Sequence, residues 1–582
     1  MMFWRKLSSQ IKSGFAQKYT NLRGDSPEAN WFCKSIKVIG IFVVCLLGFF
    51  VLLSALKDKP FFGLHSTLDD LKPSKKDVDF DDIIKHNKFL GEYFAQPPFE
   101  LSQQDKLLGG LLPAGLDEES CISRYQSVMY RKEQKLQPSP YLVSRLRKYE
   151  ALHKQCGPLT DSYKQTLEYL NSGSQQNYNS TGCKYVIWTP IHGLGNRILS
   201  LASTFLYALL TNRVLLVDPE SKISHLFCEP FPEVSWLVPS DFPFIKNLSR
   251  FYSNSPQSYG NLKKNNNHSY LISSSLPPYV YVHLVHDYDD DDKQFFCDHD
   301  QTVLQNVPWL IMRSNIYFIP SLFSVSPFQQ EINNLFPNLG TVFHFLGRYL
   351  FHPTNYVWGL VTTYYNTNLA RADEKMGIQI RVLDKDSNRF KRVLDQILDC
   401  AGKENLLPQL INETKSIAIQ SVKLNRTKAV LITSLTSDYF EEIKTMYWNH
   451  STITGEVIQV YQPSHEENEQ NENEMQNIKA WAEMYLLSLT DKLVTSGWST
   501  FGYVAHSLGG LKPWILYLYE DYKAPGMSCQ RAVSMEPCMH APPYFDCTRK
   551  QYTGNTVKLI PQIQHCEDKL WGIKFIDRDD DL

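Results

Sequence analysis

The sequence lacks several signatures that would place it in a familiar class of protein. None of its 12 cysteines forms a Cys-x-x-Cys pair, which argues against a zinc site or a thiol redox centre. Its formal net charge is only −2, so charge gives no support to a nucleic-acid partner. We find no internal repeats. What remains is a chain of 582 residues, 43% hydrophobic and 13% aromatic, long enough for two or three domains.

The glycine-rich loop His192–Arg197 also lacks what the common nucleotide-binding loops have. A dinucleotide loop needs a third glycine where Ile198 stands, and a P-loop needs Gly-Lys-Ser/Thr where Asn196 and Arg197 stand. The loop still follows an apolar strand and begins a helix with apolar residues at helical spacing. Because free N–H groups at a helix start attract anions, we expect an anion beside Gly195. The alternative is a plain helix start with a surface arginine.

A membrane anchor is predicted near the N-terminus. Residues 38–56 carry no charge, and a helix of that length spans about 28 Å, enough for one crossing. The run lies too deep, and lacks the small-residue cleavage site, for a removable signal peptide. Seven Lys/Arg against two acids precede it, although the residues nearest the run show no charge bias. We expect a cytoplasmic tail at 1–37, a signal anchor at 38–56 and a stem at 57–115.

The part beyond the anchor fits an oxidising lumen. Ten of the 12 cysteines lie there, an even number, and nearby Cys121 and Cys156 are one candidate pair. Six N-glycosylation sequons also lie there, at Asn179, Asn247, Asn267, Asn412, Asn425 and Asn449. These features predict a single-pass type II protein with a luminal folded part.

Alternating strands and helices predict an α/β fold. The C-terminal part has five short strand patterns separated by helical patterns, at 376–382, 429–433, 457–461, 492–495 and 514–518. A second such unit begins at Lys184, with strands at 185–188, 214–217 and 279–285. Helix is expected within Ser120–Lys154, and loops at Asn261–Ser269 and Ser464–Gln476. We therefore expect two Rossmann-like domains facing a cleft, 116–370 and 371–582.

Ligands of parallel sheets bind where the strands end, and two polar motifs stand there. Arg381 ends the first C-terminal strand, where it can clamp a pyrophosphate with parallel charge-assisted bonds. Its alternative is a structural pairing with Asp384 or Asp386. Ser499 and Thr500 follow the fourth strand at a helix start, where their hydroxyls either bind phosphate or cap the helix.

Three stretches together resemble the plant xyloglucan fucosyltransferase family, over about residues 120 to 575. They are Gly193-Leu-Gly-Asn-Arg197, Gly377-Ile-Gln-Ile-Arg381 and Ser496-Gly-Trp-Ser-Thr-Phe-Gly502. The resemblance implies a Golgi membrane enzyme, an inverting galactoside 2-α-L-fucosyltransferase with a variant GT-B fold, which uses GDP-fucose and needs no metal or other cofactor. The expected donor-binding residues are Gly195, Asn196, Arg197, Arg381, Ser499, Thr500, Phe501 and Gly502.

The match to the wider α1,2- and α1,6-fucosyltransferase group is incomplete. That group has a His-x-Arg-Arg-x-Asp stretch, whereas this chain has Gln379 in place of the histidine and Val382 in place of the second arginine. From the motif of that wider group, we therefore expect only Arg381 to have the same role in this chain.

The implied reaction needs charge stabilisation on the leaving GDP and a route for the acceptor proton. Without a metal, Arg381, helix N-termini and hydroxyls would stabilise the leaving group, at about 3–4 kcal/mol for each preorganised donor. The acceptor needs either a base or a well-developed oxocarbenium ion. The base candidates are Asp300, expected in a Cys-bounded loop between the two domains, and His192. The alternative for Asp300 is a solvated surface carboxylate.

Other functions remain open from the residues alone. An apolar strand runs into the acidic stretch Asp287–Asp292, as in metal-dependent Asp-x-Asp glycosyltransferases, although such a stretch is more often a solvated loop. A noncatalytic luminal lectin or scaffold would keep the fold but need no donor. A dehydrogenase, with Asp218 on a ribose, is the weakest alternative because the third glycine is missing.

The acceptor is the least determined partner. Xyloglucan galactose is the family's best-known target, and arabinogalactan-protein glycans are the alternative. Trp236, Tyr288 and Trp358 could stack on sugar rings, but core packing is the more common fate of aromatic residues. A homodimer, or a complex with other Golgi glycosyltransferases, is a further expectation.

Overall fold

The structure is a computed structural model of the chain. It describes residues 78–85, 106–131, 136–172, 182–265, 277–382, 387–411, 426–517, 528–549, 551–552 and 560–577. The chain divides into two compact units, Met1–Lys76 and Asp77–Leu582, and every element below belongs to the second. The expected tail and anchor lie outside the described residues. Within the ranges that are described, no helix is long and apolar enough to cross a membrane.

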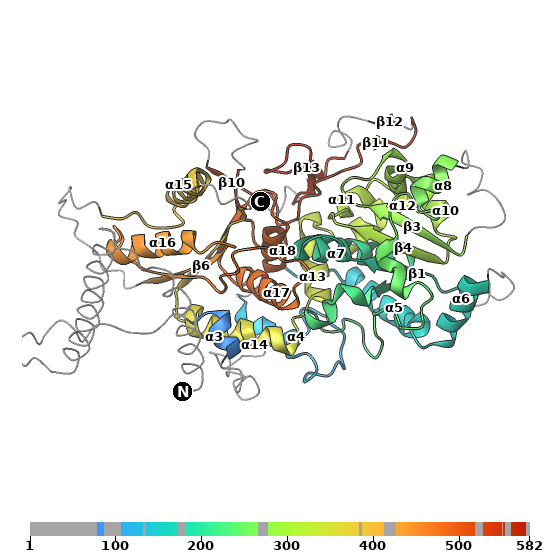
Figure 1. Cartoon of the computed structure of the whole chain (residues 1–582), viewed down its shortest axis with the longest axis horizontal. Coiled ribbons are helices and arrows are strands. Elements are labelled where there is room, and N and C mark those ends of the chain that lie inside the picture. The colour runs from blue at the N-terminus through green and yellow to red at the C-terminus, as the bar shows by residue number, and fades with distance from the viewer. Residues whose placement is uncertain are drawn as a thin grey trace, which may run out of the picture. The chain divides into compact units, whose positions relative to one another are not determined.

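The N-terminal half contains a parallel four-stranded sheet in the order β2-β1-β4-β3 (Figure 1). Its strands are β1 (Tyr185–Thr189), β2 (Val214–Val217), β3 (Tyr279–Leu284) and β4 (Trp309–Ser314). The first three match the sequence prediction. Strand β4 was missed, because a short apolar run without alternation fits a buried helix as well as a buried strand.

The C-terminal half contains a six-stranded sheet in the order β10-β9-β8-β5-β6-β7. Its strands are β5 (Glu374–Gln379), β6 (Thr427–Thr433), β7 (Val457–Tyr461), β8 (Lys492–Ser496), β9 (Trp514–Leu516) and β10 (Cys529–Arg531). The first five are parallel, as predicted, and β10 pairs antiparallel with β9.

The helices of this half also follow the prediction. They are α15 (Ser387–Lys403), α16 (Asp438–Asn449), α17 (Glu474–Ser488) and α18 (Thr500–Gly509). Helix α17 begins inside the stretch expected as a loop, which therefore ends at Asn473. Likewise α8 (Tyr259–Asn265) replaces the first part of the loop expected at 261–269.

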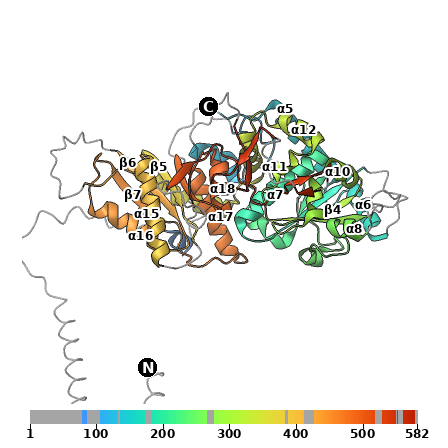
Figure 2. The same ribbon diagram turned by 90° about the horizontal axis from the view of Figure 1, so that it is seen from above.

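One continuous hydrophobic core joins the two halves. Helix α7 (Leu194–Thr211), which follows β1, packs directly against α18, and both lie between the two sheets in Figures 1 and 2. The core cluster contains Leu201 from α7, Trp481 from α17 and Leu508 from α18, all buried. The halves are therefore held against each other by apolar packing, and the helix starts at this interface have fixed positions.

Part of the expected stem belongs to the folded unit. Helix α3 (Phe80–Lys85) packs on α14 (Asn355–Tyr364) with Phe80 fully buried, and Asp81 forms an ion pair with Lys479 of α17. Leu111 and Leu112 are buried as well. Of the stretch Ser120–Lys154, the described residues are helical in α4 (Ile122–Gln126), in a short 3₁₀ turn after it, and in α5 (Pro140–Cys156).

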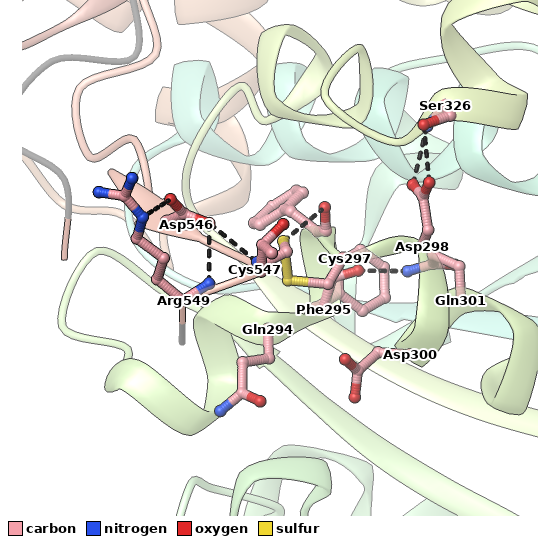
Figure 3. The surroundings of a disulfide bond; sticks show 12 residues. Gln294, Phe295, Cys297, Asp298, Asp300, Gln301, Ser326, Asp546, Cys547 and Arg549 are labelled. Carbon is pink, nitrogen blue, oxygen red and sulfur yellow. Dashed lines mark hydrogen bonds and ion pairs between the residues drawn. A yellow bond between two sulfur atoms is a disulfide. The ribbon is translucent and has the colours of Figure 1, made fainter. Parts of the chain in front are cut away.

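All ten cysteines beyond residue 56 form disulfides. The pairs are Cys121–Cys228, Cys156–Cys183, Cys297–Cys547, Cys400–Cys529 and Cys538–Cys566. The suggested pairing of Cys121 with Cys156 is wrong, because each has a nearer partner in space. Figure 3 shows Cys297–Cys547, which ties the C-terminal tail to the N-terminal domain. Full pairing agrees with an oxidising compartment.

Candidate active site

A pocket of about 910 Å³, including its solvent-open mouth, lies where the C-terminal sheet meets the N-terminal domain. It is lined by the start of α7, the ends of β5 and β6, the loop before α17, one face of α17, and the start of α18. The lining residues are Gly193, Leu194, Gly195, Asn196, Gln379, Ile380, Arg381, Thr433, Ser434, Leu435, Ser464, Glu466, Glu469, Asn471, Gln476, Asn477, Lys479, Ala480, Glu483, Met484, Thr500 and Phe501.

Two helix N-termini meet at this pocket. A Cβ atom on Gly195 of α7 would lie 2.7 Å from the backbone carbon of Thr500 in α18, so only glycine permits this approach. The Thr500 hydroxyl donates a hydrogen bond to Asn196 Oδ1 (3.1 Å), and Asn196 Nδ2 donates to the carbonyl of Asn315 (2.8 Å). Asn196 thus ties the two domains together. The positive ends of both helix dipoles face the pocket, which suits an anion.

Arg381 supplies a full positive charge to the same pocket. It follows β5, its backbone N–H donates to Ser496 Oγ (2.9 Å), and its Nη1 donates to the carbonyl of Trp498 (3.2 Å). The side chain is exposed and lines the pocket, as its position at a strand end predicts. Asp384 and Asp386, its alternative partners, lie outside the described residues.

Three of the expected donor-binding residues are not among those that line the pocket. Arg197 is 7% exposed; its Nε donates to the His192 carbonyl (2.7 Å) and its Nη2 pairs with Glu472 (2.7 Å). Ser499 is fully buried and caps α18 by accepting from the Gly502 N–H, so the capping alternative holds for it. A Cβ atom on Gly502 would lie 1.9 Å from Thr495 Oγ1, so that glycine serves helix–strand packing.

Glu483 of α17 was missed from the sequence. It is buried at the pocket wall, and its Oε1 accepts from Ser464 Oγ at 2.5 Å. Desolvation raises the pKa of its carboxyl group to about 8, so it is largely protonated at neutral pH. A signal was present, because Glu483 is an acid inside the apolar helical stretch 480–487.

Asp300 does not face the cleft. It lies in α10 (Asp298–Leu304), inside the N-terminal domain and beside the Cys297–Cys547 disulfide (Figure 3), and not in a loop between the domains. It is 5% exposed, and its Oδ1 accepts hydrogen bonds from the Tyr259 hydroxyl and the Lys263 ammonium group. The carboxylate is therefore part of a buried ion pair and cannot reach an acceptor in the pocket.

His192 belongs to a hydrogen-bond network that fixes its tautomer. Asn315 Oδ1 accepts from the backbone N–H of His286 (2.9 Å), which turns the amide nitrogen toward both histidines. That nitrogen donates to Nδ1 of His192 (2.7 Å) and to Nδ1 of His286 (2.8 Å). In its neutral form, each ring therefore carries its proton on Nε2. Burial and the nearby His286 lower the pKa of His192. Because its Nδ1 accepts from Asn315, the ring atom left for a ligand is the Nε2–H donor.

The aspartate run forms a helix start. Asp289 caps α9 (Asp290–Lys293) by accepting from the N–H groups of Asp291 and Asp292, and it pairs with Lys264. Desolvation raises the pKa of Asp292 to about 7. Across the described ranges, the one group of three residues whose atoms converge as metal ligands is Cys538, Cys566 and Asp568, and its two cysteines form a disulfide.

A second network, also missed, holds the loop that contacts Arg381. Trp498 has a positive φ of 57°, and its N–H donates to Asp568 Oδ2 (2.7 Å). The same oxygen accepts from the Tyr503 hydroxyl, and His540 Nε2 lies 2.9 Å from that hydroxyl. No local sequence pattern predicts these contacts, because Asp568 and His540 come from the C-terminal tail.

The aromatic residues considered for sugar stacking are all in the core. Trp236, Tyr288 and Trp358 are at most 6% exposed, so none can stack on a ligand. Core packing was the alternative considered for each, and it is confirmed.

A parallel sheet whose strand ends meet two helix N-termini and an arginine defines a class of protein: an α/β enzyme that binds a phosphorylated ligand at its domain interface. Comparison with known proteins narrows this class. Residues 82–548 match the family model for xyloglucan fucosyltransferase. The chain belongs to that family, as its motifs indicate, and is a fucosyltransferase.

The relatives are similar over most of their length. A galactoside 2-alpha-L-fucosyltransferase of Pisum sativum is 54% identical over 548 residues, 93% of each chain. An Arabidopsis thaliana enzyme of the same name is 55% identical, covering 81% of this chain and 83% of the relative. Among solved structures, a lysine-for-arginine mutant of Arabidopsis thaliana FUT1 in complex with GDP has 53% identity and a TM-score of 0.73, covering 81% of this chain and 100% of that one.

Proposed function

We propose that this enzyme transfers L-fucose from GDP-fucose to the 2-hydroxyl group of a galactose in a cell-wall glycan, xyloglucan being the favoured acceptor. The observation that carries the proposal is the convergence of Arg381 and the starts of α7 and α18 in one pocket. The names of the relatives, and the GDP bound to the solved relative, support the same donor and linkage.

The pocket offers separate places for the two ends of the nucleotide. The diphosphate lies against Arg381 and the helix starts at Gly195 and Thr500. The guanine base lies toward α17, where N1–H and the 2-amino group donate to the Glu483 carboxylate. Donation of this kind favours the ionised carboxylate, which offsets the cost of its burial. The family fold is then a GT-B variant, with the donor held by the C-terminal sheet.

The reaction follows from these placements. The bond from fucose C1 to the phosphate oxygen breaks as the bond to the galactose 2-hydroxyl oxygen forms on the opposite face, which inverts the anomeric centre. Because the sugar develops oxocarbenium character, the attacking hydroxyl group can lose its proton to water and needs no side-chain base. Arg381 and the two helix starts stabilise charge on the departing GDP, at about 3–4 kcal/mol for each preorganised donor. His192 and His286 present Nε2–H groups that can orient acceptor oxygens. We propose that no metal or other cofactor is required, because these donors supply the positive charge.

We also propose that the protein is a single-pass type II protein of the Golgi membrane with a luminal catalytic domain. The five disulfides support an oxidising lumen. The sequon asparagines Asn247 and Asn449 are both exposed, as glycosylation requires. A homodimer, or a complex with other Golgi glycosyltransferases, remains part of the proposal.

One set of assays tests the proposal against its alternatives. The purified unit Asp77–Leu582 is incubated with GDP-fucose and either xyloglucan or arabinogalactan, with and without EDTA. We expect transfer to xyloglucan that persists in EDTA; activity lost in EDTA and restored by Mn²⁺ would support the metal-dependent alternative. GDP should raise the melting temperature of the wild type but not of Arg381→Ala. Absence of a shift in the wild type would favour a noncatalytic glycan-binding protein.

A further inference from the structure

The loop between β13 (Ile563–His565) and β14 (Ile573–Phe575) exposes two large apolar side chains in succession. Leu570 is 60% exposed and Trp571 is 48% exposed. Neighbouring exposed apolar side chains of this size often mark a binding surface.

The backbone of the loop that exposes Leu570 and Trp571 is held in place by covalent and hydrogen bonds. Cys566 at the start of the loop is bonded to Cys538, and the Tyr544 hydroxyl donates a hydrogen bond to the carbonyl of Trp571. The Gly572 N–H donates to the carbonyl of Lys569 (2.8 Å), and a Cβ atom at Gly572 would lie 2.5 Å from the Cys538 sulfur. The indole ring of Trp571 is therefore presented to solvent from a fixed support.

This loop is continuous with the donor site. The Trp571 ring meets the Trp498 ring edge-on at 5.8 Å, and the ammonium group of Lys569 lies 3.5 Å from the Trp498 ring centre and 4.5 Å from that of Trp571. The Trp498 carbonyl accepts from Arg381. One residue thus separates the exposed indole from the guanidinium proposed to hold the diphosphate.

The C-terminal tail also brings the loop to the interface between the two domains. The tail starts from β10 on the donor sheet, and Figure 1 shows β13 between that sheet and the N-terminal domain. The Tyr288 hydroxyl, just after β3, donates to the carbonyl of Ala541 (2.7 Å). His540, the residue before Ala541, contacts the hydroxyl group of Tyr503 in α18. The tail that carries the loop therefore contacts both domains at their interface.

We propose that Trp571, supported by Trp498 and Lys569, is the platform on which the acceptor sugar stacks. This rests on the proposed function, which supplies the acceptor class: a glycan that carries galactose. The C–H bonds on one face of a galactopyranose form an apolar surface that packs on the flat indole ring. The Lys569 ammonium group, beside the ring, is a hydrogen-bond donor of the kind that sugar hydroxyl groups accept from.

The test compares Trp571→Ala and Trp571→Phe with Trp448→Ala. Trp448 is a matched control because it is 80% exposed but lies near the end of α16, beside the edge strand β7. The acceptor is a galactosylated xyloglucan oligosaccharide at saturating GDP-fucose. We expect Trp571→Ala to raise the acceptor KM about tenfold, Trp571→Phe to raise it less, and Trp448→Ala to leave it unchanged.

Donor binding is measured separately as the thermal shift caused by GDP. The platform predicts an undiminished GDP shift in Trp571→Ala, which also shows that the variant is folded. An unchanged acceptor KM in Trp571→Ala would overturn the proposal, as would an equal KM increase in Trp448→Ala. Loss of the GDP shift together with activity would assign the loop to donor binding instead. Failure of the wild type to bind GDP would instead contradict the proposed function itself.

Discussion

We expect GDP binding to be coupled to the loss of a proton from Glu483. Burial raises the pKa of this carboxyl group to about 8, so about nine-tenths of the unliganded molecules are protonated there at pH 7. If guanine donates to the carboxylate, bound GDP requires the ionised form. Each binding event should then release about 0.9 proton at pH 7 from this group.

The affinity follows from the same pKa. The fraction ionised in the free protein is about one in a hundred at pH 6 and one half at pH 8, so GDP should bind about 50-fold more weakly at pH 6 than at pH 8. Isothermal titration calorimetry in buffers of different ionisation enthalpy measures both the affinity and the protons released. Glu483→Gln is the matched control, because it has no proton to lose while GDP and the other groups titrate as before.

Two results would refute this reasoning. Equal proton release and an equal pH dependence in the wild type and Glu483→Gln would show that Glu483 does not ionise on binding. Unchanged GDP affinity in Glu483→Gln at pH 8 would show that the guanine base lies elsewhere.

The same raised pKa predicts how stability changes with pH. The contribution of Glu483 to the stability of the unliganded protein is full below about pH 4.5 and is lost as the pH rises to about 8. Glu483→Gln should remove this part of the decline.

Three further predictions follow from the geometry. Arg381→Ala should lower kcat/KM about 10²- to 10³-fold and Arg381→Lys should recover part of it; equal activity in all three would remove Arg381 from the reaction. Gly195→Ala should lower both the melting temperature and the thermal shift caused by GDP, because its Cβ would lie 2.7 Å from Thr500. The control Gly402→Ala, also in a helix but with open space around its Cβ, should lower neither. Equal effects of the two substitutions would contradict the close approach of the two helices. Asn315→Asp should move the His192 proton from Nε2 to Nδ1, which ¹⁵N-detected NMR reads directly; an Nδ1–H tautomer already in the wild type would contradict the network.

The regular part of the fold was predictable because it is encoded locally. Strands β5 to β9 are short apolar runs, each followed by a polar or helical segment, and this alternation shows in any window of the chain. The position of Arg381 at the pocket was predictable for the same reason, since a strand end locates the ligand side of a parallel sheet. The pocket positions of Asn196 and Thr500 were predictable from helix starts, whose unpaired N–H groups are likewise a local property.

The failures have a common physical cause, which is contact between distant segments. Asp300 looked available because its partner Lys263 lies 37 residues earlier in the chain. Cys121 pairs across 107 residues, beyond any spacing argument. Arg197 fits an anion loop by composition, but its orientation is set by Glu472, which a separate loop brings to it. The sugar platform at Trp571 is likewise invisible in sequence, because exposure distinguishes it from the buried tryptophans only in the folded chain.

The most direct test of the account is the location of GDP in a crystal structure of this protein. The account predicts the diphosphate between Arg381 and the starts of α7 and α18, with guanine N1–H and the 2-amino group against Glu483. A diphosphate bound instead in the neighbouring pocket on the α15 side of Arg381, beside Arg389 and Arg392, would contradict it.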